Sequence, residues 1–144
     1  MKRTDSRGSA PNREVVLDTH IVLWWCSDSA RLSPSAAAAI HDATTITISA
    51  ISMWEVAMLV GKQRIALDRP VVAWMRSLGE QPRVRVLPVT GEIAVRAGEL
   101  TGLHGDPADR LIAATTLDAR ADLITKDSRL LDWAAPRIDV RAIW

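Results

Sequence analysis

The sequence lacks phenylalanine and tyrosine, and it contains a single cysteine, Cys26. One cysteine cannot form a disulfide within the chain, which excludes a disulfide-stabilised secreted scaffold and a cysteine-rich zinc site. Long apolar runs are missing as well, because Ile21–Cys26 and Val56–Val60 are far too short to span a membrane. The polar stretch Met1–Glu14 has no hydrophobic core of a signal peptide. We therefore expect a cytoplasmic protein with no membrane partner.

Neither sign of charge dominates, since 18 Lys and Arg face 17 Asp and Glu for a formal net charge of +1. The total alone does not indicate a nucleic-acid partner. A length of 144 residues, 48% of them hydrophobic, fits one folded domain. Residues 1–13 are polar, dense in Lys and Arg, and have no periodic apolar face. We expect them to be a disordered leader or a tag remnant, and residues 14–144 to form a single domain.

Short apolar segments alternate with segments of helical pattern along the rest of the chain. The capping pair Ser33-Pro34 marks one helix start, and Gly61 marks one helix end. The predicted strands are Glu14–Asp18, Thr44–Ser49, Val84–Val89, Asp122–Thr125 and Ile138–Ile143. The predicted helices are Thr19–Ser27, Pro34–His41, Ala50–Val60, Pro70–Leu78, Glu92–Leu100, Pro107–Ala119 and Leu130–Trp133. This alternation predicts an α/β fold, an α/β/α sandwich whose mostly parallel central sheet is flanked by helices.

Acidic residues follow the predicted strands at the edge where an open parallel sheet binds its ligands. Asp18 follows the first strand, Asp127 follows the fourth, and Glu55 comes six residues after the second. Asp106 and Asp109 lie at a helix start, which tends to face the same edge. Each of the four aspartates could instead serve its helix as a cap or as a first-turn carboxylate.

Glu55 is harder to explain as a structural residue. It is the only charged residue between Asp42 and Lys62, in a helix that is apolar on nearly every side. A partly buried carboxylate needs a counter-charge, and neighbouring carboxylates would raise one another's pKa unless a cation lay among them. Oxygen ligands favour Mg²⁺ or Mn²⁺. Zinc is disfavoured because His20, His41 and His104 lack the spacing of a zinc pair. We expect the histidines to be surface or hydrogen-bonding residues, with His20 the possible exception, since it follows Asp18 at the proposed edge.

Four motifs in this order resemble those of a PIN domain, and specifically a VapC-type toxin of a bacterial toxin–antitoxin pair. The first is the strand and the Asp-Thr pair at Val15–His20, and the second is Ser49–Glu55. The others are Gly105–Ala114, with its Asp-Pro-Ala-Asp stretch, and Leu123–Asp127. Each motif is weak alone, but four in order make the match specific. The resemblance covers the chain from about residue 15 to residue 144.

The resemblance implies an endoribonuclease that depends on Mg²⁺ or Mn²⁺ and hydrolyses RNA with metal-activated water. Carried over by motif, the catalytic acids are Asp18, Glu55, Asp109 and Asp127. Asp18, Asp109 and Asp127 would hold metal, and Glu55 would hold metal or orient the water. Asp106 would be a helix cap or an outer-shell residue, with Thr19 and Thr125 as hydrogen-bonding neighbours. The implied partners are RNA, a VapB-type antitoxin and a second copy of the chain.

RNA also needs a cationic surface. Residues 61–90 carry six basic residues against two acidic ones, and Lys62 and Arg64 are the first of them. The alternative is that these charges solvate an exposed helix and loop. Arg110 could contact phosphate or pair with an acid. With few aromatic residues for base stacking, recognition is expected to depend on backbone charge and RNA shape.

The tryptophans of the predicted helices are Trp24, Trp25, Trp54 and Trp74, and packing in the core is the default for each. Trp24 and Trp25 project about 100° apart on one helix, so both cannot easily face the same core. We expect one of the two to belong to an interface.

Two other readings stay open. A receiver-like phosphoacceptor domain shares the alternation of strands and helices, but it would need two adjacent acids after the first strand, where Asp18 is followed by Thr19-His20. A catalytically inactive binding module would use its acids only to cap helices.

Overall fold

The computed structural model describes residues 13–144. Most of the predicted leader, residues 1–12, lies outside the described residues. Arg13, which the prediction places in the leader, is already hydrogen-bonded to the fold. Its backbone N–H donates to the Thr44 hydroxyl (3.0 Å), and its carbonyl accepts from the Thr44 N–H (2.8 Å).

A five-stranded sheet forms the centre of the protein, and every neighbouring pair of strands is parallel. Its strands lie in the order β3-β2-β1-β4-β5. They are β1 (Glu14–Leu17), β2 (Thr45–Ser49), β3 (Val84–Leu87), β4 (Asp122–Ile124) and β5 (Arg141–Ile143). The parallel pairing confirms the fold class predicted from the alternation of strands and helices.

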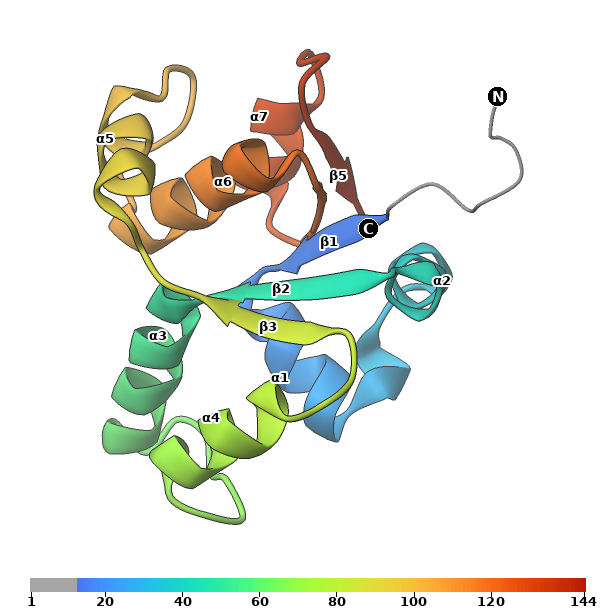
Figure 1. Ribbon diagram of the computed structural model, residues 1–144, viewed down its shortest axis with the longest axis vertical. Coiled ribbons are helices and arrows are strands. Elements are labelled where there is room, and N and C mark those ends of the chain that lie inside the picture. The colour runs from blue at the N-terminus through green and yellow to red at the C-terminus, as the bar shows by residue number, and fades with distance from the viewer. Residues whose placement is uncertain (1–12) are drawn as a thin grey trace.

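Helices cover both faces of the sheet, as Figure 1 shows. Val15 and Leu17 of β1 belong to one core, while Val16 between them belongs to another. The first core receives α1 (Thr19–Ser27), α2 (Pro34–Asp42), α3 (Ala50–Gly61) and α4 (Val71–Gly79). The opposite face carries α5 (Gly91–Glu99), α6 (Pro107–Ala119) and α7 (Ser128–Ala134). A short 3₁₀ helix, η1 (Ser29–Arg31), follows α1.

The strand order creates a switch point between β1 and β4. From β1 the chain adds β2 and β3 on one side, and it then returns to add β4 and β5 on the other. Ligands of open α/β sheets bind where the order reverses in this way, beyond the carboxyl ends of the strands. The backbone N–H of Asp18, just past β1, donates to the Ile124 carbonyl at the end of β4 (3.0 Å). The first and last predicted acids therefore follow adjacent strands.

Two predicted strand boundaries are wrong by more than one residue. β3 ends at Leu87 rather than at residue 89, because Pro88 has no N–H to continue the ladder. β5 begins at Arg141 rather than at residue 138, and Ile138 is fully exposed. Across residues 13–144, none of the helices combines the length and the apolar character needed to cross a bilayer.

The four helical tryptophans have different environments. Trp74 is buried, as expected of a core residue. Trp54 is 57% exposed, so the expectation that it packs in the core is wrong. Trp24 and Trp25 are both half-buried at the edge of the first core. Their side chains line different pockets, as expected from their angular separation on α1.

Candidate functional site

One open pocket of about 370 Å³ gathers all five predicted acids. The acids come from the starts of α1, α6 and α7 and from the first half of α3. Three of them also cap helices, since the carboxylates of Asp18, Asp106 and Asp127 accept backbone N–H groups at the first turns. Capping and a place in the pocket are thus compatible. The lining residues are Asp18, Glu55, Asp106, Asp109 and Asp127, with His20, Trp24, Lys126 and Arg129.

Asp18 is held at the floor of the pocket and is only 8% exposed. Its Oδ1 accepts from the Thr19 N–H (2.7 Å), and its Oδ2 accepts from the Thr125 hydroxyl (2.7 Å). The same hydroxyl oxygen accepts the Asp127 N–H (3.0 Å). Thr125 therefore links the ends of β1 and β4 and fixes two acids relative to each other.

Glu55 is half-buried on α3 and is oriented by α1. The Thr19 hydroxyl donates to Glu55 Oε1 and also shares a hydrogen bond of 2.8 Å with the Ser52 hydroxyl. Thr19 thus contacts Asp18 through its backbone and Glu55 through its side chain. Ser52, which is fully buried one turn before Glu55, was not predicted to belong to the site.

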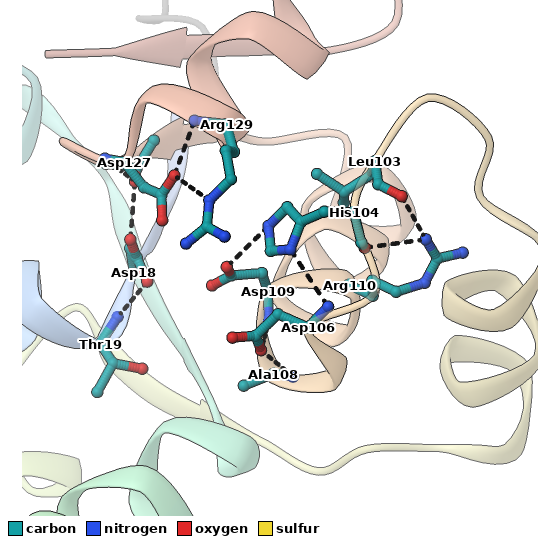
Figure 2. A network of polar contacts seen from close by, with 11 residues as sticks. Asp18, Thr19, Leu103, His104, Asp106, Ala108, Asp109, Arg110, Asp127 and Arg129 are labelled. Atoms are coloured by element: carbon teal, nitrogen blue, oxygen red, sulfur yellow. Dashed lines mark hydrogen bonds and ion pairs between the residues drawn. The ribbon is translucent and has the colours of Figure 1, made fainter.

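Asp109 enters the pocket from the first turn of α6, with 9% of its surface exposed. Asp106 caps that helix, accepting from the N–H groups of Ala108 (2.9 Å) and Asp109 (3.2 Å). His104 lies against both acids, as Figure 2 shows: its Nδ1 accepts the Asp106 N–H (3.2 Å), and its Nε2 is 3.1 Å from Asp109 Oδ2. This Nε2 is buried and makes no hydrogen bond within residues 13–144, although it lies close to the Asp109 carboxylate.

Two cationic side chains at this pocket were not identified from the sequence as site residues. Arg129 extends from the first turn of α7 toward the space between the acids in Figure 2, with its Nε 3.6 Å from Asp127 Oδ1. Lys126 lies between Thr125 and Asp127 in the chain and lines the same pocket. In the sequence, only their position close to Asp127 could have indicated that Lys126 and Arg129 lie at the pocket.

Burial and mutual repulsion disturb the ionisation of the acids. Burial raises the pKa of Asp18 and of Glu55, against the opposing hydrogen bonds from Thr125 and Thr19. Burial, followed by the charges of the four other acids, raises the pKa of Asp109 to about 7. The pocket therefore carries more negative charge than its own cations balance, and a bound cation would relieve the repulsion.

The donor chemistry fits a hard divalent cation. Within residues 13–144, no group of three or more His, Cys, Asp or Glu side chains is placed so that it could hold a metal ion as it stands. Mg²⁺ commonly keeps several water molecules and takes only one or two carboxylates from a protein. Carboxylates that line a solvent-open pocket satisfy that requirement, and oxygen donors suit Mg²⁺ or Mn²⁺ better than zinc.

The structure does not bring Arg110 into this pocket. Its guanidinium donates instead to backbone carbonyls of the segment before α6, at distances from 2.7 to 3.3 Å. The acceptors belong to Ala97, Gly98, Leu100, Leu103 and His104. Because these bonds engage its N–H groups, Arg110 does not have the expected contact with phosphate or with an acid. It holds the α5–α6 connection in place instead, and with it His104.

Lys62 and Arg64 are exposed beyond the far end of α3. Lys62 follows Glu55 by seven residues, which places it about 10 Å further along the helix axis. Other basic residues of segment 61–90 serve the fold: Arg69 pairs with Asp68 (3.0 Å), and Arg85 pairs with Glu14 (2.6 Å). The high positive charge of the segment therefore overstates the cationic surface that RNA could reach.

Comparison with known proteins agrees with this arrangement. Residues 15–135 match the PIN domain. The chain is 41% identical over 124 residues to Ribonuclease VapC22 of Mycobacterium tuberculosis, covering 85% of this chain and 94% of that protein. Nucleases of the PIN family generally depend on divalent metal ions.

Solved structures share the fold at lower identity. VapBC-1 from nontypeable Haemophilus influenzae superposes with a TM-score of 0.63 at 20% identity, over 90% of this chain and 96% of the other. A toxin–antitoxin complex from Klebsiella pneumoniae gives a TM-score of 0.61 at 21% identity, over 88% and 94% of the two chains. From the sequence match, the shared fold and the pocket of acids, we conclude that the chain belongs to the PIN domain family, among its VapC-type members.

Proposed function

We propose that this protein is a metal-dependent endoribonuclease and the toxin of a type II toxin–antitoxin pair. The observation that carries the proposal is the single pocket in which Asp18, Glu55, Asp109 and Asp127 meet at the switch point of the sheet. The 41% identity to a protein named a ribonuclease supports the reaction. Because cellular RNA is the proposed substrate, the proposal places the activity in the cytoplasm.

In the proposed reaction, the residues of the pocket would bind metal or position the attacking water. Asp18, Asp109 and Asp127 would hold Mg²⁺ or Mn²⁺, each ion directly through one or two of these carboxylates and otherwise through water, with Asp106 behind them as a cap. When bound, such an ion neutralises the acids, binds the scissile phosphate and lowers the pKa of a water molecule. Thr125 keeps Asp18 and Asp127 in register, and Thr19 directs the Glu55 carboxylate toward the pocket. Glu55 would hold metal or accept a proton from the attacking water.

The reaction is tested with single-stranded RNA and DNA of the same sequence. In the presence of Mg²⁺ or Mn²⁺, we expect internal cleavage of the RNA only, leaving a 5′-phosphate and a 3′-hydroxyl. End-labelled substrates and sequencing gels read both the cut site and the end groups. Failure to cut any strand of total cellular RNA, with a folded protein, would leave the binding module as the better explanation. Phosphorylation by acetyl phosphate would instead favour the receiver-like domain.

A VapB-type antitoxin is the proposed protein partner. A second groove, of about 800 Å³, lies between α1 and the segment that contains α4, away from the acids. Apolar side chains of Leu23, Trp25 and Leu67 line it beside polar ones such as Asp68 and Arg69, and the apolar part would take an apolar helix. The Trp25 position supports the expectation that one tryptophan of α1 serves an interface. A homodimer remains part of the proposal.

We also expect Lys62 and Arg64 to contact the RNA backbone. Changing both to glutamine should weaken RNA binding and reduce the slope of log K against log salt by about 1.4, or about 0.7 for each lost contact with a single strand. Fluorescence anisotropy between 50 and 200 mM salt measures the slope. Arg96→Gln, at an exposed position of α5, is the matched control. An unchanged slope in the double variant would remove both residues from the RNA surface.

A further inference from the structure

Trp24 is the aromatic side chain that lines the pocket of acids. It lies six residues after Asp18, in the middle of α1, and it is only half-buried. His20 precedes it by one helical turn and lines the same pocket, with its ring centroid 6.2 Å from that of Trp24. A large indole ring that remains partly open beside an acidic pocket does more than fill the core.

A cluster of aromatic and cationic groups surrounds this indole. The ring centroid of Trp144 is 6.0 Å from that of Trp24, with the two planes inclined by 55°. The Arg31 guanidinium carbon lies 4.5 Å from the Trp24 centroid. Lys126 Nζ lies 5.8 Å from the Trp24 centroid and 5.5 Å from that of Trp144. We call Trp24, Trp144, Arg31 and Lys126 the Trp24 cluster.

The lining of the pocket combines two kinds of chemical group. Beside the carboxylates it contains an indole with Lys126 next to it. Within residues 13–144, Arg31 and Lys126 form no ion pair with a carboxylate, and both are instead held against aromatic rings. A positive charge next to a partly exposed aromatic ring matches a nucleotide, whose phosphate is anionic and whose base has a flat π-face.

We propose that the Trp24 cluster is a nucleotide subsite, in which one base next to the scissile phosphate stacks on the face of Trp24 that Arg31 does not cover, and an adjoining phosphate contacts Lys126 and Arg31. This inference rests on the proposed function and names the residues that position its substrate. The pocket volume of about 370 Å³ is within the range of small-ligand sites, about 300–1,000 Å³. A cationic protein arm is disfavoured beside Trp24 because Arg31 and Lys126 would repel it. Recognition would then use base stacking, which the sequence analysis expected to be minor.

The test uses the full chain and a 12-nucleotide single-stranded RNA that contains one cut site. Copies of this RNA carry an abasic residue at each position around the cut. With the wild-type protein, one abasic position should raise KM or Kd between about fivefold and a hundredfold, the loss typical of one stacked base. In Trp24→Ala, affinity for the intact RNA should fall by a similar factor, and the abasic penalty at that position should disappear. Trp24→Phe should recover most of the affinity.

Trp54→Ala is the control, because Trp54 is exposed on α3 and does not line the pocket. It should bind and cleave as the wild type does. The proposal would be overturned if the loss of affinity caused by the abasic residue were the same in the wild type, in Trp24→Phe and in Trp24→Ala. So would the absence of a penalty at every position in the wild-type protein, an outcome that stands even if Trp24→Ala does not fold. If Trp24→Ala binds RNA normally but no longer binds an antitoxin, the cluster is a protein-binding surface and the proposal fails.

The nuclease activity and the Trp24 subsite can be refuted separately. Absence of cleavage by the wild-type protein, with abasic-sensitive binding that depends on Trp24, would refute the nuclease and keep the subsite. Normal cleavage without any dependence on Trp24 would keep the nuclease and refute the subsite.

Discussion

Asp18→Asn is expected to lower the rate of RNA cleavage by about a thousandfold, the scale on which a single electrostatic group at a reacting phosphate or carbonyl acts. Asp18 is the most enclosed acid of the pocket, and Thr19 and Thr125 hold both of its oxygens. Asparagine has the same shape and is as good a helix cap, so α1 should keep its start. The change removes the charge that would hold a metal ion and leaves the fold in place.

The control for this variant is Asp118→Asn, at an exposed position on the other end of α6. Initial cleavage rates on an RNA with a single cut site, at saturating Mn²⁺, give the ratio of wild-type to variant activity. Circular dichroism checks that each variant is folded. Full activity of Asp18→Asn in a folded protein would show that Asp18 is only a helix cap, and the metal-dependent mechanism would lose its central residue.

Removing divalent ions is expected to abolish cleavage and to make the protein less stable as the pH rises from about 5 to 8. The folded-state pKa of Asp109 is raised to about 7, above the usual 3.8, by burial and by the neighbouring acids. Between these two pKa values the folded protein binds a proton that the unfolded chain has released. The free energy of unfolding therefore declines as the pH rises and Asp109 loses that proton. EDTA exposes this loss, and added Mg²⁺ or Mn²⁺ should reverse it and restore cleavage.

Asp109→Asn separates this effect from other titrations. At pH 8 without metal, we expect its Tm to exceed that of the wild type by at least about 3 °C, the shift that accompanies about 1 kcal/mol in a domain of this size. At pH 5 the difference should shrink, since Asp109 is then protonated in the folded state. Thermal scans in EDTA across this range measure the trend. A constant difference at all pH values would mean that repulsion among the acids does not determine the stability of the pocket.

Local sequence signals determined most of the fold. The Ser33-Pro34 start of α2 was predictable from capping chemistry alone. The end of α3 was predicted to within one residue, but Gly61 is the last residue of the helix rather than its stop, and the left-handed conformation falls on Gln63 (φ 59°). The errors lie at strand ends, where tertiary pairing decides. Ile138 is apolar like a strand residue, yet it pairs with no strand of the sheet that the structure describes, because the pairing of β5 with β4 begins only at Arg141.

Asp18 and Asp127 were predictable because they follow strands, and the topology brings the ends of β1 and β4 together. Asp106 and Asp109 were predictable from a helix start and Glu55 from its apolar surroundings in the sequence. The residues that surround the acids were not. His104 reaches Asp109 only because Arg110 holds the preceding loop, a tertiary arrangement with no periodic signature. Trp24 resembled a core residue because its sequence neighbours are apolar, and only the turn of α1 shows that its ring lies at the pocket.

The three acids that cap α1, α6 and α7 also determine which mutations could silence this protein. Alanine at Asp18, Asp106 or Asp127 would remove a helix cap together with a pocket carboxylate, so an inactivating change would also lower the amount of folded protein. Asparagine would remove the charge and keep the cap. Selection against the activity should therefore recover two kinds of survivor: unstable chains that are degraded, and folded chains with asparagine at a cap that still occupy their partners. The second kind would act as a sink for any inhibitor protein in the same cell.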